Sequence, residues 1–110
     1  MTNSTKVSAV IISVSIGKKR AAKQLAYTLL EKKLIACANM ITGVRSMYRW
    51  KGKILKSKEV MLLCKTSKAK SKKVTQMIQK LHPAERPVIE EITVQSLNSE
   101  AMAWLSESLK

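Results

Sequence analysis

The stretch from Leu34 to Lys53 constrains the fold more than any other part of the chain. It begins as an apolar, β-prone run, passes through Gly43, and ends in Tyr48 and Trp50 before a Lys-Gly-Lys sequence. A second strand-like run, Ile54–Thr66, follows that sequence directly, and its VMLLCKT end is expected to be buried. Two such runs that meet at a glycine-containing turn predict a long β-hairpin. The isolated glycine inside the first run indicates a bulge or a bend.

The hydrophobic period changes on both sides of this hairpin. Over residues 18–33 apolar side chains recur three and four positions apart, which predicts an amphipathic helix. The same spacing over 74–81 predicts a second helix, which Pro83 ends, and this proline favours an extended conformation at His82. The apolar positions expected on the inner faces of these two helices are Ala22, Leu25, Ala26, Leu29, Leu30, Val74, Met77, Ile78 and Leu81.

Two further strands and a short helix complete the predicted elements. The runs over 7–15 and 88–94 are typical of strands, and Asn98 is expected to cap a third helix. The inner face of that helix is expected to hold Met102, Leu105 and Leu109, with Trp104 nearby.

The resulting order is β-α-β-β-α-β-α. Its first six elements predict an α+β, ferredoxin-like (split βαβ) fold, an antiparallel sheet with two helices on one face, followed by a C-terminal helix. We expect a single domain over residues 1–110, structured from about residue 7 to residue 109. One sheet face and the long hairpin stay uncovered in a lone subunit, which favours oligomerisation through sheet edges.

The composition is that of a globular protein. Hydrophobic residues make up 45% of the chain, and no apolar run reaches the roughly 18 residues of a membrane span. The first residues lack a basic segment and a signal-peptide cleavage pattern, so we expect a cytoplasmic protein without a membrane partner. Cys37 and Cys64 lie in strand-like contexts without C-x-x-C spacing, which predicts two buried, reduced thiols.

The charge is strongly positive. The chain has 21 basic and 7 acidic residues, a net charge of +14. Such a balance favours contact with polyanions or membrane surfaces. However, the basic residues are scattered lysines for the most part, whereas base reading and bidentate phosphate recognition favour arginine. The simplest interpretation is a solvated, lysine-rich surface, and nucleic acid is not the expected partner.

Several segments resemble, in order, the motifs of the CutA divalent-cation-tolerance family. They include the cysteine-containing strand, the glycine-to-tryptophan hairpin, a His-Pro segment and a closing tryptophan motif. The segments are Leu34–Asn39, Gly43–Ile54, Glu59–Thr66, His82–Ile89 and Ala103–Leu105.

This resemblance implies a ferredoxin-like subunit in a tight homotrimer similar to the PII signalling proteins. Hairpins of that family reach onto neighbouring subunits, and clefts form between the subunits. The family is associated with tolerance to copper and other divalent metals and has no accepted reaction. The resemblance therefore implies a non-catalytic protein that binds copper, another divalent metal or a small ligand such as an anion, with no other cofactor.

The chain departs from the family pattern at four positions that bear on its clefts and ligands. Ala84 replaces a tyrosine of the His-Pro-Tyr segment, and Met102 replaces another tyrosine. Leu81 and Ser13 stand where some members have a histidine and a cysteine, so two candidate copper ligands are missing. The first helix also opens on basic residues where the family usually has acidic ones.

The candidate site residues form two groups. His82 and Cys37 are the candidate metal ligands, because imidazole and thiolate bind copper and a trimer could bring them together. The candidate cleft or assembly residues are Tyr48, Trp50, Glu59, Lys65 and Trp104. No nucleophile, second histidine or glycine-rich phosphate loop accompanies them, so we expect that the protein is not an enzyme.

Two other classes of function remain open at this point. A split βαβ fold with a charge of +14 also suits a nucleic-acid-binding module, although the inner strands lack the aromatic residues that stack bases. A purely structural trimer, in which the hairpins serve only assembly, is the other alternative.

Overall fold

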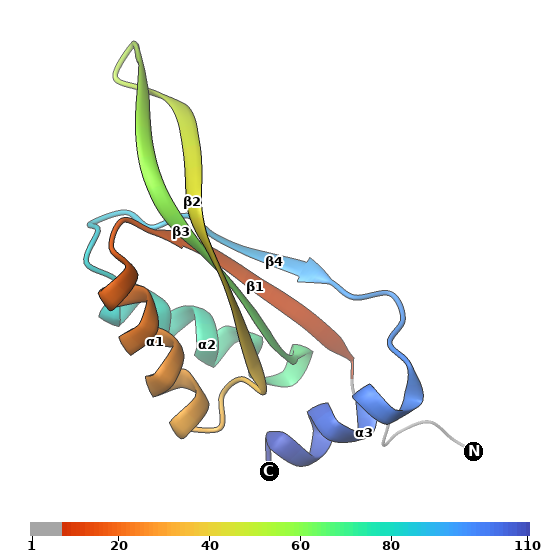
Figure 1. Ribbon diagram of the computed structural model, residues 1–110. Coiled ribbons are helices and arrows are strands. Elements are labelled where there is room, and N and C mark those ends of the chain that lie inside the picture. Colours follow the sequence, from red (N-terminus) through yellow and green to blue (C-terminus); the bar gives the residue numbers. More distant parts are fainter. Residues whose placement is uncertain (1–7) are drawn as a thin grey trace.

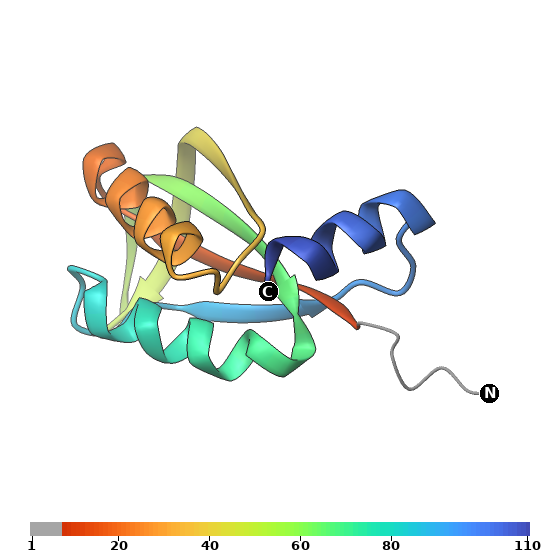
Figure 2. The same cartoon turned by 90° about the horizontal axis from the view of Figure 1, so that it is seen from below.

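The computed structural model describes residues 8–110 and contains a four-stranded antiparallel sheet with two helices on one face (Figures 1 and 2). The strand order is β2-β3-β1-β4, which is the order of a ferredoxin-like fold, as predicted. The predicted start of the first strand, residue 7, lies outside the described residues. The strands are β1 (Ala9–Ile16), β2 (Cys37–Trp50), β3 (Lys53–Ser67) and β4 (Ile89–Thr93), and the helices are α1 (Lys19–Glu31), α2 (Lys68–Leu81) and α3 (Ser99–Ser108).

The main core lies between the sheet and the pair α1 and α2. Even-numbered residues of β1 and β3 face the helices, so Ile12 lies opposite Cys64 and Val14 opposite Leu62. Cys64 is fully buried there, as the sequence predicted. The buried members of this core are Val10, Ile12, Val14, Ile16, Ala22, Leu25, Ala26, Leu29, Ile35, Val60, Leu62, Cys64, Val74 and Ile78.

The sequence predicts wider apolar faces for α1 and α2 than the faces that the structure buries. Leu30 is 40% exposed and Leu81 is 43% exposed, so the prediction that both point inward is wrong. The sheet covers only the stripe centred on Leu25, Leu29, Val74 and Ile78, and side chains at its margin remain in solvent.

The ends of α2 have simple local causes. At its N-terminus the Ser67 side chain accepts a hydrogen bond from the backbone N–H of Lys70, at 3.3 Å. At its C-terminus His82 leaves the helix in an extended conformation, with φ −70° and ψ 134°, as the following proline predicts.

The third helix packs at one end of the sheet, away from the helix pair α1 and α2 (Figure 2). Its Leu105 and Leu109 are buried with Ala9 of β1 in a second, smaller core, while Met102 is partly buried. Asn98 occupies the N-cap position, but its side chain makes no capping hydrogen bond. The predicted cap is therefore correct in position and wrong in mechanism. No helix within residues 8–110 is long and apolar enough to cross a membrane.

The β2–β3 hairpin extends well beyond the sheet (Figure 1). The last pair between β1 and β3 is Ile16 with Val60, so the residues between 44 and 59, called here the hairpin arm, have no third strand beside them. Lys51 and Gly52 form its turn with φ values of 49° and 78°, the left-handed pair of a type I′ turn. The predicted turn position is confirmed.

A bulge lies at the base of the arm, where Gly43 predicted one. Ile41 pairs with Met61, but Val44 pairs with Glu59, so β2 contains one extra residue between these pairs. Gly43 has a φ of 73°, a conformation that L side chains rarely adopt.

Candidate functional site

The bulge decides which way the two aromatic side chains of the arm point. Before the bulge, even-numbered residues of β2 face the helices, as Ala38 does opposite Cys64. After it, Tyr48 lies opposite Leu55, an odd-numbered residue of β3. Because side chains alternate along a strand, Tyr48 and Trp50 now point to the face opposite α1 and α2. We call this side the open face.

The aromatic residues of the arm line a shallow hollow of about 430 Å³. Tyr48 is 44% exposed and Trp50 45% exposed, and the Lys51 ammonium lies 5.8 Å from the centroid of the Trp50 ring. That distance is within the range of a cation–π contact. The hollow is lined by Tyr48, Trp50, Lys51, Leu55, Glu85 and Arg86.

A second group gathers at the opposite end of the sheet. Cys37 pairs with Lys65 across β2 and β3, with both side chains on the open face. Lys65 and Trp104 line a largely apolar hollow of about 180 Å³ between the sheet and α3. The half-buried Cys37 sulfur lies 3.9 Å from the side-chain oxygen of Asn39. The expectation of a buried thiol is thus met only in part here.

The two cysteines have different environments. Burial, and to a smaller extent the proximity of Cys37, raise the pKa of the Cys64 thiol to about 12. Cys64 therefore stays a neutral thiol and lacks the thiolate character that metal binding and nucleophilic attack require. Cys37 lies on the other face of the sheet and is partly accessible.

His82 uses both ring nitrogens within its own chain. Nδ1 accepts a hydrogen bond from the backbone N–H of Ala84 at 2.9 Å, which leaves the ring proton on Nε2. Nε2 then donates to the backbone carbonyl of Ser15, at 2.7 Å. The imidazole joins the segment after α2 to the end of β1, and a metal could bind only after one of these bonds breaks.

One subunit does not bring the two candidate metal ligands together. Cys37 lies beside Lys65, which pairs with Ile11, whereas His82 contacts Ser15. Four residues along β1 correspond to about 13 Å. Within residues 8–110, no three side chains of the His, Cys, Asp or Glu type gather closely enough to hold a metal ion. The remaining cleft candidate, Glu59, pairs with Val44 at the base of the arm and lines neither the hollow at Trp50 nor the hollow at Trp104.

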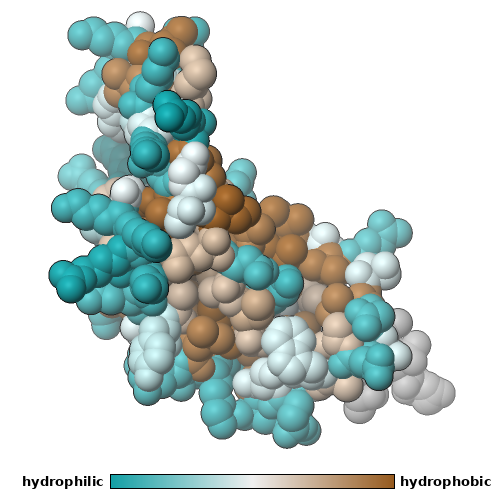
Figure 3. Space-filling view, viewed as in Figure 1, coloured by the Kyte–Doolittle hydropathy of each residue, from teal (hydrophilic) through white to brown (hydrophobic). Residues whose placement is uncertain are grey.

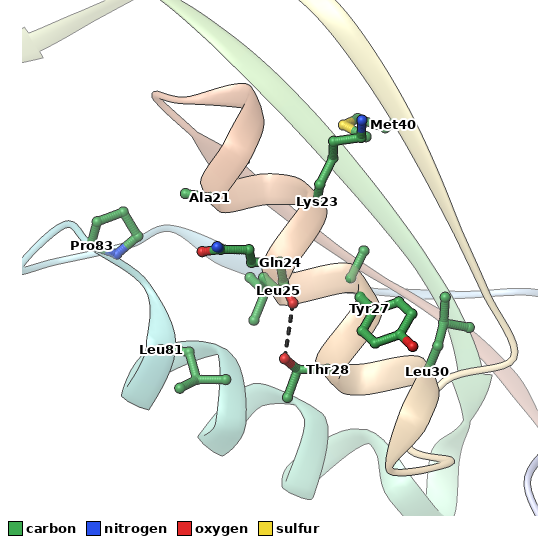
Figure 4. Close-up of a pocket in the computed structure, with 11 residues that line it drawn as sticks. Ala21, Lys23, Gln24, Leu25, Tyr27, Thr28, Leu30, Met40, Leu81 and Pro83 are labelled. Atoms are coloured by element: carbon green, nitrogen blue, oxygen red, sulfur yellow. Dashed lines mark hydrogen bonds between the residues drawn. The ribbon is translucent and has the colours of Figure 1, made fainter.

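The helix side holds a feature that the sequence patterns did not indicate. A wide hollow of about 850 Å³ runs over α1 (Figure 4), with Leu81 and Pro83 on the α2 side and Met40 on the β2 side. Within it the Thr28 hydroxyl donates to the Gln24 carbonyl at 2.9 Å. The one trace of this hollow in the sequence is that the apolar stripe of α1 is wider than the sheet can cover, because it includes Leu30.

Comparisons with known proteins agree with this architecture. The family model of the CutA1 divalent ion tolerance protein matches residues 10–108. The divalent-cation tolerance protein CutA of Thermotoga maritima is 37% identical over 91% of this chain and 98% of its own length, and that of Thermus thermophilus is 31% identical over 89% and 95%. The crystal structure of CutA1 from Oryza sativa superposes with a TM-score of 0.91 at 30% identity, covering 96% of both chains. The chain therefore belongs to the CutA1 divalent ion tolerance protein family.

Proposed function

We propose that this chain forms a homotrimer of the divalent-cation tolerance type and binds a metal ion, copper above all, or a small ligand in the clefts between its subunits. The observation that carries this proposal is the hairpin arm, which has no third strand beside it and whose aromatic residues stay nearly half exposed on the open face. The arm therefore has the character of a surface that a neighbouring subunit completes.

The apolar surface available for assembly is extensive. Figure 3 shows hydrophobic side chains along the sheet, from the base of the hairpin arm toward α3. Soluble monomers rarely expose contiguous apolar patches of this kind, and β2 and β4 are both edge strands of the sheet. The exposed apolar side chains of the arm and of the open face include Ile41, Tyr48, Trp50, Leu55 and Ile92.

The residues of one subunit do not fit a complete metal site. His82 is engaged at both ring nitrogens, and the described residues supply no cluster of three ligands. Cys37 offers a soft sulfur on the open face, the side that a neighbouring subunit would approach. The metal form of the proposal therefore requires ligands from at least two subunits, with Cys37 as the first candidate and His82 as the second.

The non-catalytic part of the proposal rests on the chemistry of the side chains. The single histidine bonds backbone groups on both sides, so it does not activate a hydroxyl or a thiol. The neutral state of Cys64 removes one of the two thiols from consideration as a nucleophile.

We place the protein in the cytoplasm, since two cysteines without a disulfide suit a reducing compartment.

The nucleic-acid alternative is less well supported. Base-stacking domains of this fold use aromatic residues on the open face of the inner strands. β1 and β3 carry none, and their open-face positions include Ile11, Ser13, Met61, Leu63 and Lys65. A purely structural trimer differs from the main proposal only in lacking a ligand.

Two measurements test the proposal. Light scattering during size-exclusion chromatography is expected to give three times the chain mass of 12.3 kDa. Titration with Cu(I), Cu(II) and Zn(II) of the wild type, Cys37→Ser and His82→Ala then tests the metal. Loss of affinity in Cys37→Ser supports the shared site, and a trimer that binds none of the three metals leaves the structural alternative. A monomer at micromolar concentration contradicts the proposal as a whole.

A further inference from the structure

A hollow of about 420 Å³ lies between the end of α1 and the outer side of α2. The two helices lie side by side on the face of the sheet opposite the open face (Figure 2), so this hollow lies on the other side of the sheet from Tyr48 and Trp50. We call it the lysine hollow, because three of its lining side chains are lysines. It is lined by Lys32, Leu34, Lys73, Gln76, Met77 and Lys80.

The charges around the lysine hollow are almost all of one sign. Residues 18–33 and 68–81 together carry eleven basic residues and a single acidic one, Glu31, which is not part of the lining. The ion pairs found within residues 8–110 join Lys68 to Glu91 and Lys110 to Glu107. The lysines of the hollow therefore face one another across it without an acidic partner. A concave surface of one sign concentrates small ions of the opposite sign.

A partly buried lysine, one turn before Lys73 on α2, joins the two segments that form the walls of the hollow. The Lys70 ammonium donates to the backbone carbonyl of Lys33 at 2.7 Å and also to that of Leu109. The backbone N–H of Leu34 donates to the carbonyl of Leu29 at 3.0 Å and closes the end of α1. These bonds fix the chain after α1 against the first turns of α2, so the hollow does not need to form when a ligand arrives.

The chemistry of the lining indicates the ligand. Lysine ammoniums act as point charges with three donors each, so they can bind the oxygens of a phosphate group without the bidentate geometry that arginine supplies. Gln76 adds an amide, and the half-buried Leu34 and Met77 offer apolar surface. The volume lies within the range of about 300–1,000 Å³ that is usual for small-molecule sites. We propose that the lysine hollow binds a small phosphorylated anion, a phosphate ester or a polyphosphate.

The test measures the binding of inorganic pyrophosphate to the full chain at 150 mM NaCl. Calorimetry gives the affinity, and amide NMR shows which residues the ligand contacts. The double variant Lys73→Gln/Lys80→Gln is expected to bind about tenfold more weakly, because two charge-assisted contacts are lost. The matched control Lys19→Gln/Lys23→Gln removes the same charge from α1, outside the hollow, and is expected to weaken binding less than about twofold. Circular dichroism and thermal unfolding verify that both variants fold.

Three results would overturn the proposal. They are no binding by the wild type, an equal loss in both double variants, and amide shifts spread over the whole basic surface. Phenyl phosphate gives an additional comparison, since its ring can contact Leu34 and Met77, and it is expected to bind more tightly than inorganic phosphate. Equal affinity of the two contradicts the use of the apolar surface. None of these outcomes depends on whether the clefts between subunits bind a metal.

Discussion

Val44 lies opposite Glu59, one position away from the partner that the register at the base of the hairpin would give it. Continuing the pair of Ile41 with Met61 would place Val44 opposite Lys58. The extra residue turns every later side chain of β2 to the other face of the hairpin. Tyr48 and Trp50 lie on the open face for this reason, so a backbone feature of one residue determines which surface carries the aromatic residues of the arm.

Replacing Gly43 tests that relationship. Gly43→Ala forces an L side chain into a φ of 73°, although no atom within 4 Å would block the added carbon. We expect a loss of about 1–2 kcal/mol in the free energy of unfolding, from backbone strain alone. Gly17→Ala is the matched control, because Gly17 has open space and no positive φ, and it should stay within about 0.5 kcal/mol. Equal effects in urea unfolding would remove the special role of Gly43.

The aromatic side chains of the arm give a prediction about assembly. Tyr48→Ala removes a half-exposed ring from the open face of each subunit. We expect the proposed trimer to dissociate at concentrations roughly thirtyfold higher, because three contacts of about 1.4 kcal/mol each are lost and the midpoint concentration follows the square root of the trimer dissociation constant. Tyr27→Ala is the control, since Tyr27 is 66% exposed on the helix side. Analytical ultracentrifugation over a dilution series measures both. If the two variants dissociate alike, the arm does not hold the subunits together.

The elements of the fold could be predicted from the sequence because each has a local pattern. The period of α1, the Lys51-Gly52 turn and the proline after His82 act within a few residues of themselves. The face that Tyr48 occupies could not be predicted, because a bulge is a mismatch between two strands and Gly43 does not say how many residues are added.

The candidate site was predicted less completely, for a related reason. The sequence singled out His82 but could not reveal its bond to Ser15, because the partner is 67 residues away. The lysine hollow likewise unites residues 32–34 with residues 73–80, which only the packing of α1 against α2 brings together. Charge composition indicated a solvated surface, and the concave arrangement of that charge became visible in the folded chain.

The buried thiol of Cys64 predicts a loss of stability at alkaline pH. Its pKa is about 12 in the folded chain, against 9.0 for an unperturbed thiol, so the unfolded chain releases this proton first. Between these two pKa values the folded chain holds more protons than the unfolded chain. The free energy of unfolding therefore falls as pH rises above about 9, by up to about 1.4 kcal/mol per pH unit from this group. Urea unfolding between pH 8 and 11 measures the slope. Cys64→Ala should be less stable at pH 8 and show a flatter profile, and an unchanged slope would contradict the assignment.

The two thiols should also differ in reactivity. Cys37 is partly accessible, whereas Cys64 is fully buried and held neutral. A disulfide reagent such as dithionitrobenzoate at pH 8 is expected to modify Cys37 first and to reach Cys64 only as the chain opens. Cys37→Ser should remove the fast phase and Cys64→Ala the slow one. A fast phase that survives in Cys37→Ser would contradict the burial of Cys64.

A buried hydroxyl ties β3 to the segment after α1. The Thr66 side chain is fully buried and donates to the backbone carbonyl of Leu34 at 2.6 Å. Thr66→Val keeps the shape but leaves that carbonyl without this donor, so we expect a loss of about 1–3 kcal/mol in the free energy of unfolding. Thr93→Val, at an exposed position of β4, is the control and should change stability by less than about 0.5 kcal/mol. Because Leu34 also lines the lysine hollow, Thr66→Val should weaken pyrophosphate binding if the bond positions that wall. Affinity equal to the wild type would limit the bond to stability.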